Sequence, residues 1–191
     1  KKEIVQKIIQ AAKILEKGGA KIQEVSLLDP KVSIAVYTIL QRAEVSSNLA
    51  RYDGIRYGRN RSFFGLEAKR RIMLGTFVLS AGYFDQYYIK AQKARTKIIR
   101  DFEEIFKKVD LIISPTSPTV ALEIGEWEKN PMFGETQDVL VEPSSLAGLP
   151  GININCGYNK EGLPIGLQIF GPQKSEELIL KLAYRFEQWQ K

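Results

Sequence analysis

The chain has 191 residues, of which 44% are hydrophobic and 26% are charged, and its formal net charge is +6. These proportions are typical of a folded globular protein and exclude a disordered chain, while the longest apolar runs are too short for a membrane span. One cysteine and no histidine exclude an internal disulfide framework and the usual zinc sites, so we expect a cytoplasmic protein without a bound metal.

The first part of the chain predicts two helices with a strand between them. Apolar residues at helical spacing predict a helix over Glu3–Glu16, and Gly18-Gly19 would end it. Ala20–Val25 then predicts a short strand, which makes an α/β element of the kind that packs a helix on a mostly parallel sheet. Asp29-Pro30 opens a second helix that runs toward Leu49, because proline suits the first helical turn.

The middle of the chain predicts mainly helix. Two glycines within residues 51–58 indicate a loop, and a long helical region follows from about Leu66 to Lys108. We expect this region to break near Gly75 or Gly82, where helix propensity is lowest. The segment Lys90–Lys108 is rich in basic residues but is interrupted by acidic ones. This mixture favours a solvated amphipathic helix over an RNA-binding face.

The last part of the chain predicts a sheet and a closing helix. Leu111–Ile113, Ile152–Cys156 and Ile165–Phe170 have the apolar or alternating pattern of strands, and a turn over Asn159–Gly162 joins the last two. Ser175 can cap a helix over Ser175–Trp189. We expect the three strands to share one sheet that the first and last helices cover, within one compact lobe.

Three cations lie near the start of a predicted helix, at Lys69, Arg70 and Arg71. This is the unfavourable end, because the helix dipole is positive at its N-terminus, so a carboxylate should compensate. The sequence leaves two alternatives open. The carboxylate belongs either to a ligand or buried acidic partner, or to Glu67 in a solvated basic turn.

The candidate nucleophiles of this chain have no base beside them. Ser144 and Ser145 are adjacent, but no residue close to them in the sequence could act as a base, so a capping or packing role is favoured. Cys156 is interpreted as a small apolar core residue. Since histidine is absent, a base for acyl transfer would have to be another group, such as a lysine whose pKa is lowered by burial.

Five stretches that together extend over most of the chain resemble the amidase-signature family. They are residues 43–54 (AEVSSNLARYDG), 67–76 (EAKRRIMLGT), 114–119 (SPTSPT), 146–151 (LAGLPG) and 162–168 (GLPIGLQ). The first two are similar in particular to the A subunits of glutamine-dependent aspartyl/glutamyl-tRNA amidotransferases. The resemblance implies an α/β fold in which residues 1–191 form the C-terminal lobe of one amidase-signature domain. In that lobe a mixed β-sheet is flanked by helices, and the sheet is incomplete because the N-terminal half is absent.

The resemblance also implies a function. In this family a serine, a second serine in a cis peptide and a lysine carry the catalysis, and all three would lie in the absent N-terminal half. We therefore expect no catalytic residue in this chain and no amide hydrolysis by this chain alone. The whole subunit would hydrolyse glutamine and supply ammonia to convert Glu-tRNA(Gln) or Asp-tRNA(Asn) into Gln-tRNA(Gln) or Asn-tRNA(Asn). ATP and Mg²⁺ are expected on a partner B subunit, which would also make most of the tRNA contacts, and a C subunit would hold A and B together.

Three positions match the family's glutamine-binding residues. By resemblance, Arg71 would bind the α-carboxylate of glutamine, Asp138 its α-ammonium, and Tyr37 would line the same pocket. The alternative is that Arg71 and Asp138 form ion pairs elsewhere in the structure. Two other functions stay open, namely the C-terminal half of another amidase and a basic RNA-binding module. The short join near Arg59–Ser62, where the family carries a longer polar segment, further suggests that residues are omitted there.

Overall fold

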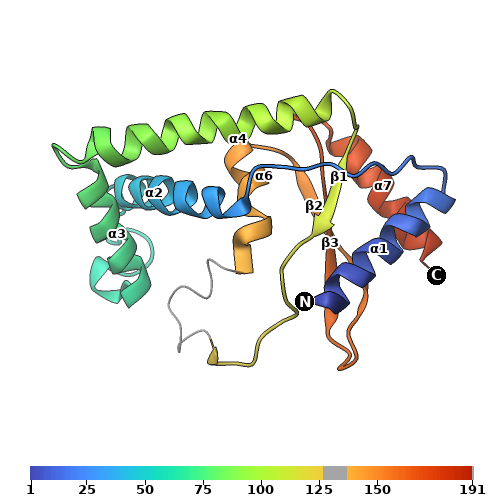
Figure 1. Cartoon of the computed structure of the whole chain (residues 1–191). Coiled ribbons are helices and arrows are strands. Elements are labelled where there is room, and N and C mark those ends of the chain that lie inside the picture. Colours follow the sequence, from blue (N-terminus) through green and yellow to red (C-terminus); the bar gives the residue numbers. More distant parts are fainter. Residues whose placement is uncertain (127–136, 191) are drawn as a thin grey trace. The chain divides into compact units, whose positions relative to one another are not determined.

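The helices and strands of the computed structural model begin and end close to the boundaries that the sequence predicts (Figure 1). The structure describes residues 1–126 and 137–190. In chain order the elements are α1 (Lys2–Lys17), α2 (Pro30–Leu49), the 3-10 turn η1 (Arg61–Phe63), α3 (Leu66–Leu79), the π-helical turn η2 (Phe84–Ile89), α4 (Lys90–Phe106), β1 (Ile112–Pro115), the 3-10 turn η4 (Asp138–Leu140), α6 (Glu142–Ala147), β2 (Gly151–Tyr158), β3 (Pro164–Phe170) and α7 (Glu176–Trp189).

The three predicted strands form one sheet in the order β1-β3-β2, as expected. Both pairings are antiparallel, with Ile112 opposite Phe170 and Ile152 opposite Ile169. The α/β class is therefore confirmed, and the three strands that the described residues contribute to the sheet pair antiparallel. The turn over Asn159–Gly162 is also confirmed. The Asn159 side chain accepts hydrogen bonds from the backbone N–H groups of Glu161 and Leu163.

The main core lies between this sheet and the helices α1 and α7. In Figure 1 the two helices lie together beside the strands, as the sequence predicts. Their buried residues pack in one cluster with those of the sheet; the cluster includes Ile4, Ala11 and Leu15 of α1, Ile154 and Cys156 of β2, Ile165, Leu167 and Ile169 of β3, and Ile179, Ala183 and Phe186 of α7. Alternate residues of a strand point to the same face, which explains why every second residue of β3 belongs to this cluster. On β3, the Phe170 ring also contacts Phe102 of α4 edge-on, at 5.7 Å between centroids.

The long helical region breaks at Gly82 and not at Gly75. Gly82 has a φ of +84° in the turn after α3, a conformation that glycine adopts without strain. Gly75 instead lies buried within α3, where a Cβ atom would collide with the carbonyl oxygen of Arg42 in α2. Its missing side chain lets the two helices approach closely.

Two local predictions are wrong. Residues 20–25 follow α1 in an extended path but form no strand, because no neighbouring segment of the described chain pairs with them. Ser175 precedes α7, but its hydroxyl donates to the carbonyl oxygen of Pro172 and makes no capping bond to the helix. None of the described helices is both long enough and apolar enough to span a membrane.

The chain divides into two compact units, although one lobe was expected. Residues 1–34 and 98–191 form the first unit, and residues 35–97 form the second. The sheet, α1 and α7 belong to the first unit, and α3 and most of α2 belong to the second. That both units are parts of one domain stays a prediction.

Candidate functional site

Arg71 and Tyr37, two of the three predicted site residues, contact each other in the second unit. Arg71 lies in the second turn of α3, and its guanidinium hydrogen-bonds with the side chain of Tyr37 from α2. These residues are 34 positions apart in the sequence, so α2 and α3 must pack together to bring them into contact. The small residue Gly75 lies buried on α3, one turn beyond Arg71, and allows this packing.

Glu67 compensates the cationic start of α3. The Nε–H group of Arg71 donates to Glu67 Oε1 at 2.7 Å, and Arg70 lies 3.6 Å from the other carboxylate oxygen. The sequence left two sources of this carboxylate open, namely a ligand or buried acidic partner, and Glu67. In the structure it is Glu67, which lies in the same helix as the cations. The signal was visible in the sequence, because residues four apart on a helix are neighbours.

The pKa values of this pair shift in the directions that an ion pair requires. The hydrogen bond from Arg71 is the main cause that holds the pKa of Glu67 below its ordinary value. The pKa of Arg71 is raised, first by its hydrogen bond to Glu67 and also by Tyr37. Both groups therefore stay charged across the neutral range, and Arg71 is held from two sides.

Asp138 belongs to the first unit, where it begins the turn η4. It is solvent-exposed, and two amide side chains fix the backbone around it. Gln137 Oε1 accepts hydrogen bonds from Ser117 Oγ at 2.8 Å and from Thr119 Oγ1 at 2.6 Å. Ser117 and Thr119 belong to the segment that follows β1. Because Gln137 directly precedes Asp138, their hydrogen bonds attach the start of η4 to that segment.

Gln168 fixes the other end of the same turn. This residue of β3 is only 7% exposed, and its Nε2 donates to the carbonyl oxygen of Leu140 and to Ser114 Oγ, both at 2.8 Å. Little in the sequence marks Gln168 as important. The one signal for it is an amide in an otherwise apolar strand, which must find partners when it is buried.

The predicted site residues thus fall into two groups. Arg71 and Tyr37 belong to one compact unit and Asp138 belongs to the other. Their convergence on one glutamine pocket stays a prediction.

The candidate nucleophiles have structural roles. Ser144 Oγ and Ser145 Oγ each donate to the carbonyl oxygen of Val141 at 3.0 Å, as a capping or packing role predicts. Cys156 is buried, its thiol donates to the carbonyl oxygen of Ile165, and burial is the main cause that raises its pKa. A thiol with a raised pKa is a poor nucleophile. No cluster of acidic or cysteine side chains that could hold a metal ion occurs among residues 1–126 and 137–190.

Comparison with known proteins places the chain in a family. A family model described as Amidase matches residues 1–180. The A subunit of glutamyl-tRNA(Gln) amidotransferase from Halothermothrix orenii is 49% identical, over 97% of this chain and 42% of that protein. The protein of the same name from Oceanobacillus iheyensis is 47% identical, over 98% of this chain and 41% of that protein. The chain therefore spans about two fifths of the length of these relatives.

Solved structures agree with this assignment. The crystal structure of the A subunit of glutamyl-tRNA(Gln) amidotransferase from Thermotoga maritima has a TM-score of 0.74 and 37% identity, over 96% of this chain and 38% of that one. A 6-aminohexanoate cyclic dimer hydrolase with 20% identity has a TM-score of 0.77, over 98% of this chain and 41% of that one, and it shows that the fold is shared.

The alignment with the Halothermothrix orenii protein spans 201 positions, and this chain has 191 residues. That relative therefore carries residues that this chain lacks within the aligned region, although the place near Arg59–Ser62 stays a prediction. Because the family model matches nearly the whole chain, this chain belongs to the amidase family.

Proposed function

We propose that this chain is part of the glutaminase subunit of a tRNA-dependent amidotransferase and forms the wall of its glutamine pocket. The relatives named as the A subunit of glutamyl-tRNA(Gln) amidotransferase, which match nearly the whole chain at close to half identity, support this assignment. The observation that carries the proposal is the position of Arg71, which Glu67 and Tyr37 hold from two sides.

Arg71 suits the α-carboxylate of glutamine. A guanidinium has five N–H groups in one plane, and a carboxylate can accept two of them in parallel. The contacts with Glu67 and Tyr37 hold the plane of the group without using all five donors. The pair with Glu67 also lowers the net charge that an approaching ligand meets, so selectivity would come from the geometry of the donors more than from long-range attraction.

Asp138 suits the α-ammonium of the same ligand. A ligand with one charge of each sign loses hydration at both when it enters a pocket, and an unpaired charge there would cost on the order of several kcal/mol. In this proposal the hydrogen bonds of Gln137 and Gln168 keep η4, and with it Asp138, in the position that the ammonium requires.

The chemical step belongs to the rest of the subunit. By the family resemblance, a serine there attacks the side-chain amide carbon of glutamine, the C–N bond breaks, and ammonia leaves. Water then hydrolyses the acyl-serine to glutamate, and the second serine and the lysine of the same part transfer the protons. We further propose that ammonia passes to a B subunit, where ATP and Mg²⁺ activate Glu-tRNA(Gln) or Asp-tRNA(Asn), that a C subunit joins the two, and that the complex is cytoplasmic.

The test compares two nitrogen donors in the complete amidotransferase. Arg71→Ala should raise the KM for glutamine at least roughly tenfold, the loss of one charge-assisted contact. Amidation driven by ammonium chloride should stay close to that of the unchanged complex, because free ammonia bypasses the glutamine pocket. Arg70→Ala, which removes a cation from the same turn, is the matched control and should change neither. Equal loss of both activities in Arg71→Ala would show a folding defect and contradict the proposal.

The two other functions have less support. A different amidase would share the fold, but it would not need a charge of each sign in its pocket, and it would turn over a neutral amide better than glutamine. An RNA-binding module would need a basic face with one sign of charge. The basic helix α4 instead buries Ile98, Phe102 and Ile105, and its last turn places Glu104 beside Lys107 at 2.5 Å.

A further inference from the structure

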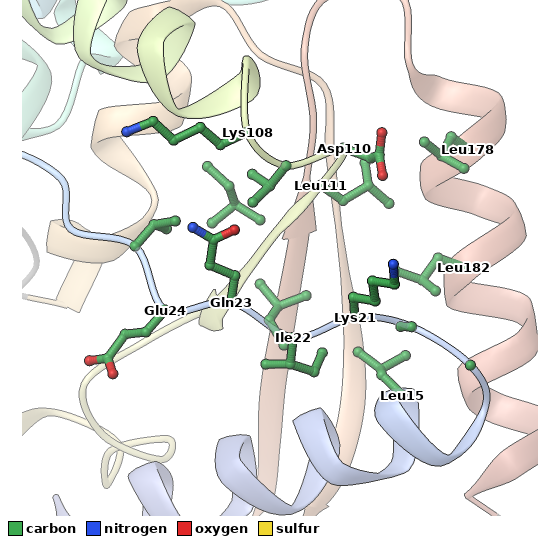
Figure 2. Close-up of a pocket in the computed structure, with 16 residues that line it drawn as sticks. Leu15, Lys21, Ile22, Gln23, Glu24, Lys108, Asp110, Leu111, Leu178 and Leu182 are labelled. Carbon is green, nitrogen blue, oxygen red and sulfur yellow. The ribbon is translucent and has the colours of Figure 1, made fainter.

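A buried hydroxyl group of the second unit, that of Ser46 in α2, is connected by two hydrogen bonds to the backbone beside Arg71 in α3. The cavity of about 940 Å³ in the first unit, which Figure 2 shows between Gln23 and Leu111, has no such connection, because none of the three candidate site residues lines it. Ser46 therefore bears on the candidate site, while this cavity does not.

The hydrogen bond between Ser46 and Thr76 has a direction that can be assigned. Ser46 Oγ and Thr76 Oγ1 lie 2.8 Å apart. Thr76 Oγ1 also lies 2.8 Å from the carbonyl oxygen of Ile72, which can only accept, so the Thr76 hydroxyl donates to it. Because a hydroxyl carries one hydrogen, Thr76 must accept from Ser46. The two bonds thus run from α2 to the carbonyl group of Ile72, the residue directly after Arg71.

This hydrogen bond lies where the two helices approach each other closely. A Cβ atom added at Gly75, the neighbour of Thr76, would lie only 2.6 Å from Ser46 Cβ. Ser46 is 9% exposed, and buried polar side chains require a hydrogen-bond partner. Thr76 is exposed, but Ser46 is not and therefore depends on this bond.

Gly75 allows the close approach, but it cannot fix the register of the two helices. Without a side chain it leaves α3 able to rotate or slide against α2, whereas a hydrogen bond is directional. Successive residues of a helix differ by about 100° and 1.5 Å, so a shift of α3 by one residue would separate Ser46 from Thr76. The same shift would move Arg71 away from Tyr37. The two contacts follow each other in the same order along both helices, so one register satisfies both.

We propose that Ser46 is a positioning residue of the glutamine site. Through Thr76 it holds α3 in the register at which Arg71 meets Tyr37, and it touches no ligand itself. The inference rests on the proposed function, and it adds to that function a residue outside the pocket that determines how well glutamine is captured. Ser46 would have no part in breaking the amide bond.

The two nitrogen donors of the complete amidotransferase test this role. Ser46→Ala should raise the KM for glutamine roughly three- to tenfold, the net effect of one hydrogen bond, and should leave amidation driven by ammonium chloride unchanged. Thr76→Val, which keeps the shape and removes the hydroxyl, should have the same effect. The double variant should be no worse than either single one, because both remove one contact. Thr76→Ser keeps the hydroxyl and should restore the KM. Ser47→Ala, at an exposed neighbouring position, is the matched control.

The outcomes separate this inference from the proposed function. An unchanged KM in Ser46→Ala, together with a raised KM in Arg71→Ala, would overturn the positioning role and leave the proposed function intact. An unchanged KM in Arg71→Ala would contradict the proposed function, and the inference would fail with it. Equal loss with both nitrogen donors in Ser46→Ala would show a general folding defect and also overturn the positioning role.

A second measurement follows the Arg71 side chain without any activity. The Nε–H group of Arg71 donates to Glu67, and its exchange with water can be measured by nuclear magnetic resonance on this chain labelled with ¹⁵N in arginine. At one pH, Ser46→Ala and Thr76→Val should each speed this exchange at least roughly threefold, and Thr76→Ser should not. Exchange that is equally slow in all the variants would show that Ser46 does not position Arg71.

Discussion

Glu67 and Arg71 form an ion pair within α3 whose two members influence each other's protonation. The folded-state pKa of Glu67 is lowered, mainly by the hydrogen bond from Arg71. A carboxyl with a lowered pKa contributes stability above its ordinary pKa, and it loses that contribution as the pH falls through the lowered value. The pair is therefore intact at neutral pH and breaks only in acid.

The first prediction concerns this titration. In Arg71→Gln the pKa of Glu67 should rise back toward the ordinary value for glutamate, because its hydrogen-bond donor and nearest positive charge are both weakened or lost. Nuclear magnetic resonance of the Glu67 side-chain carboxyl carbon during a pH titration measures it. Lys69→Gln, which removes a charge from the same turn but keeps Arg71, should leave the lowered value nearly unchanged.

The second prediction concerns Gly75, whose missing side chain lets α3 approach α2. A Cβ atom there would meet the carbonyl oxygen of Arg42, which is backbone and cannot rotate away. Gly75→Ala should lower the free energy of unfolding by about 1–3 kcal/mol, as overpacking does, although alanine is the better helix former. Gly65→Ala, at a position with no atom within 4 Å of the added carbon, is the control. An equal effect of the two substitutions in denaturant unfolding would contradict the close approach of the helices.

Among the elements, those with their own periodic pattern could be predicted from the sequence. Helices α1, α2 and α7 and strands β2 and β3 contain enough apolar residues at the right spacing to mark their extent. The break of the long helical region could be narrowed only to two glycines, because Gly75 and Gly82 have the same propensity and only packing distinguishes them. The strand at Ala20–Val25 failed because its stability depends on a partner.

The residues of the candidate site also divide into those that a local sequence pattern predicts and those that depend on packing in three dimensions. Neither Arg71 nor Tyr37 carries a local signal for their contact, which depends on the packing of α2 against α3; both were found by resemblance. Glu67 could have been assigned as the partner from its spacing alone. Gln168 could not, since its role depends on where the carbonyl oxygen of Leu140 lies in three dimensions.

The third prediction concerns the attachment of η4 to the sheet through Gln168. Gln168→Met keeps the size and removes the amide, so the Leu140 carbonyl oxygen loses that donor. The free energy of unfolding should fall by about 1–3 kcal/mol, the cost of a buried polar group without its partner. The exposed Gln173→Met is the control and should change it by less than about 0.5 kcal/mol. Urea unfolding measures the free energy of unfolding of both variants. A change in Gln168→Met no larger than that in the control would show that the contact of Gln168 with η4 does not stabilise the fold.

At the scale of the whole molecule, the proposed function gives this chain binding residues and assigns the groups that break an amide bond to the rest of the subunit. In this chain the described serines at positions 144 and 145 donate to a backbone carbonyl oxygen, and the thiol is buried. The fourth prediction is that this chain by itself releases no ammonia from glutamine above background, measured with a coupled glutamate dehydrogenase assay. Adding the remaining part of the subunit should restore activity. Glutamine hydrolysis by the separate chain at a rate near that of the complete subunit would disprove the assignment of catalysis to the other part.

The contact between the ends of α1 and α7 has an optical consequence. The ring of Trp189 lies so close to Gly18, the residue after α1, that a side chain there would collide with it. The chain has one other tryptophan, Trp127, so the variant Trp127→Phe leaves a single indole at the point where these helices meet. Its emission should shift to longer wavelength when α7 leaves α1 and water reaches the whole ring. The fluorescence of one natural residue would thus report the docking of α7 on α1 in real time, without any attached dye.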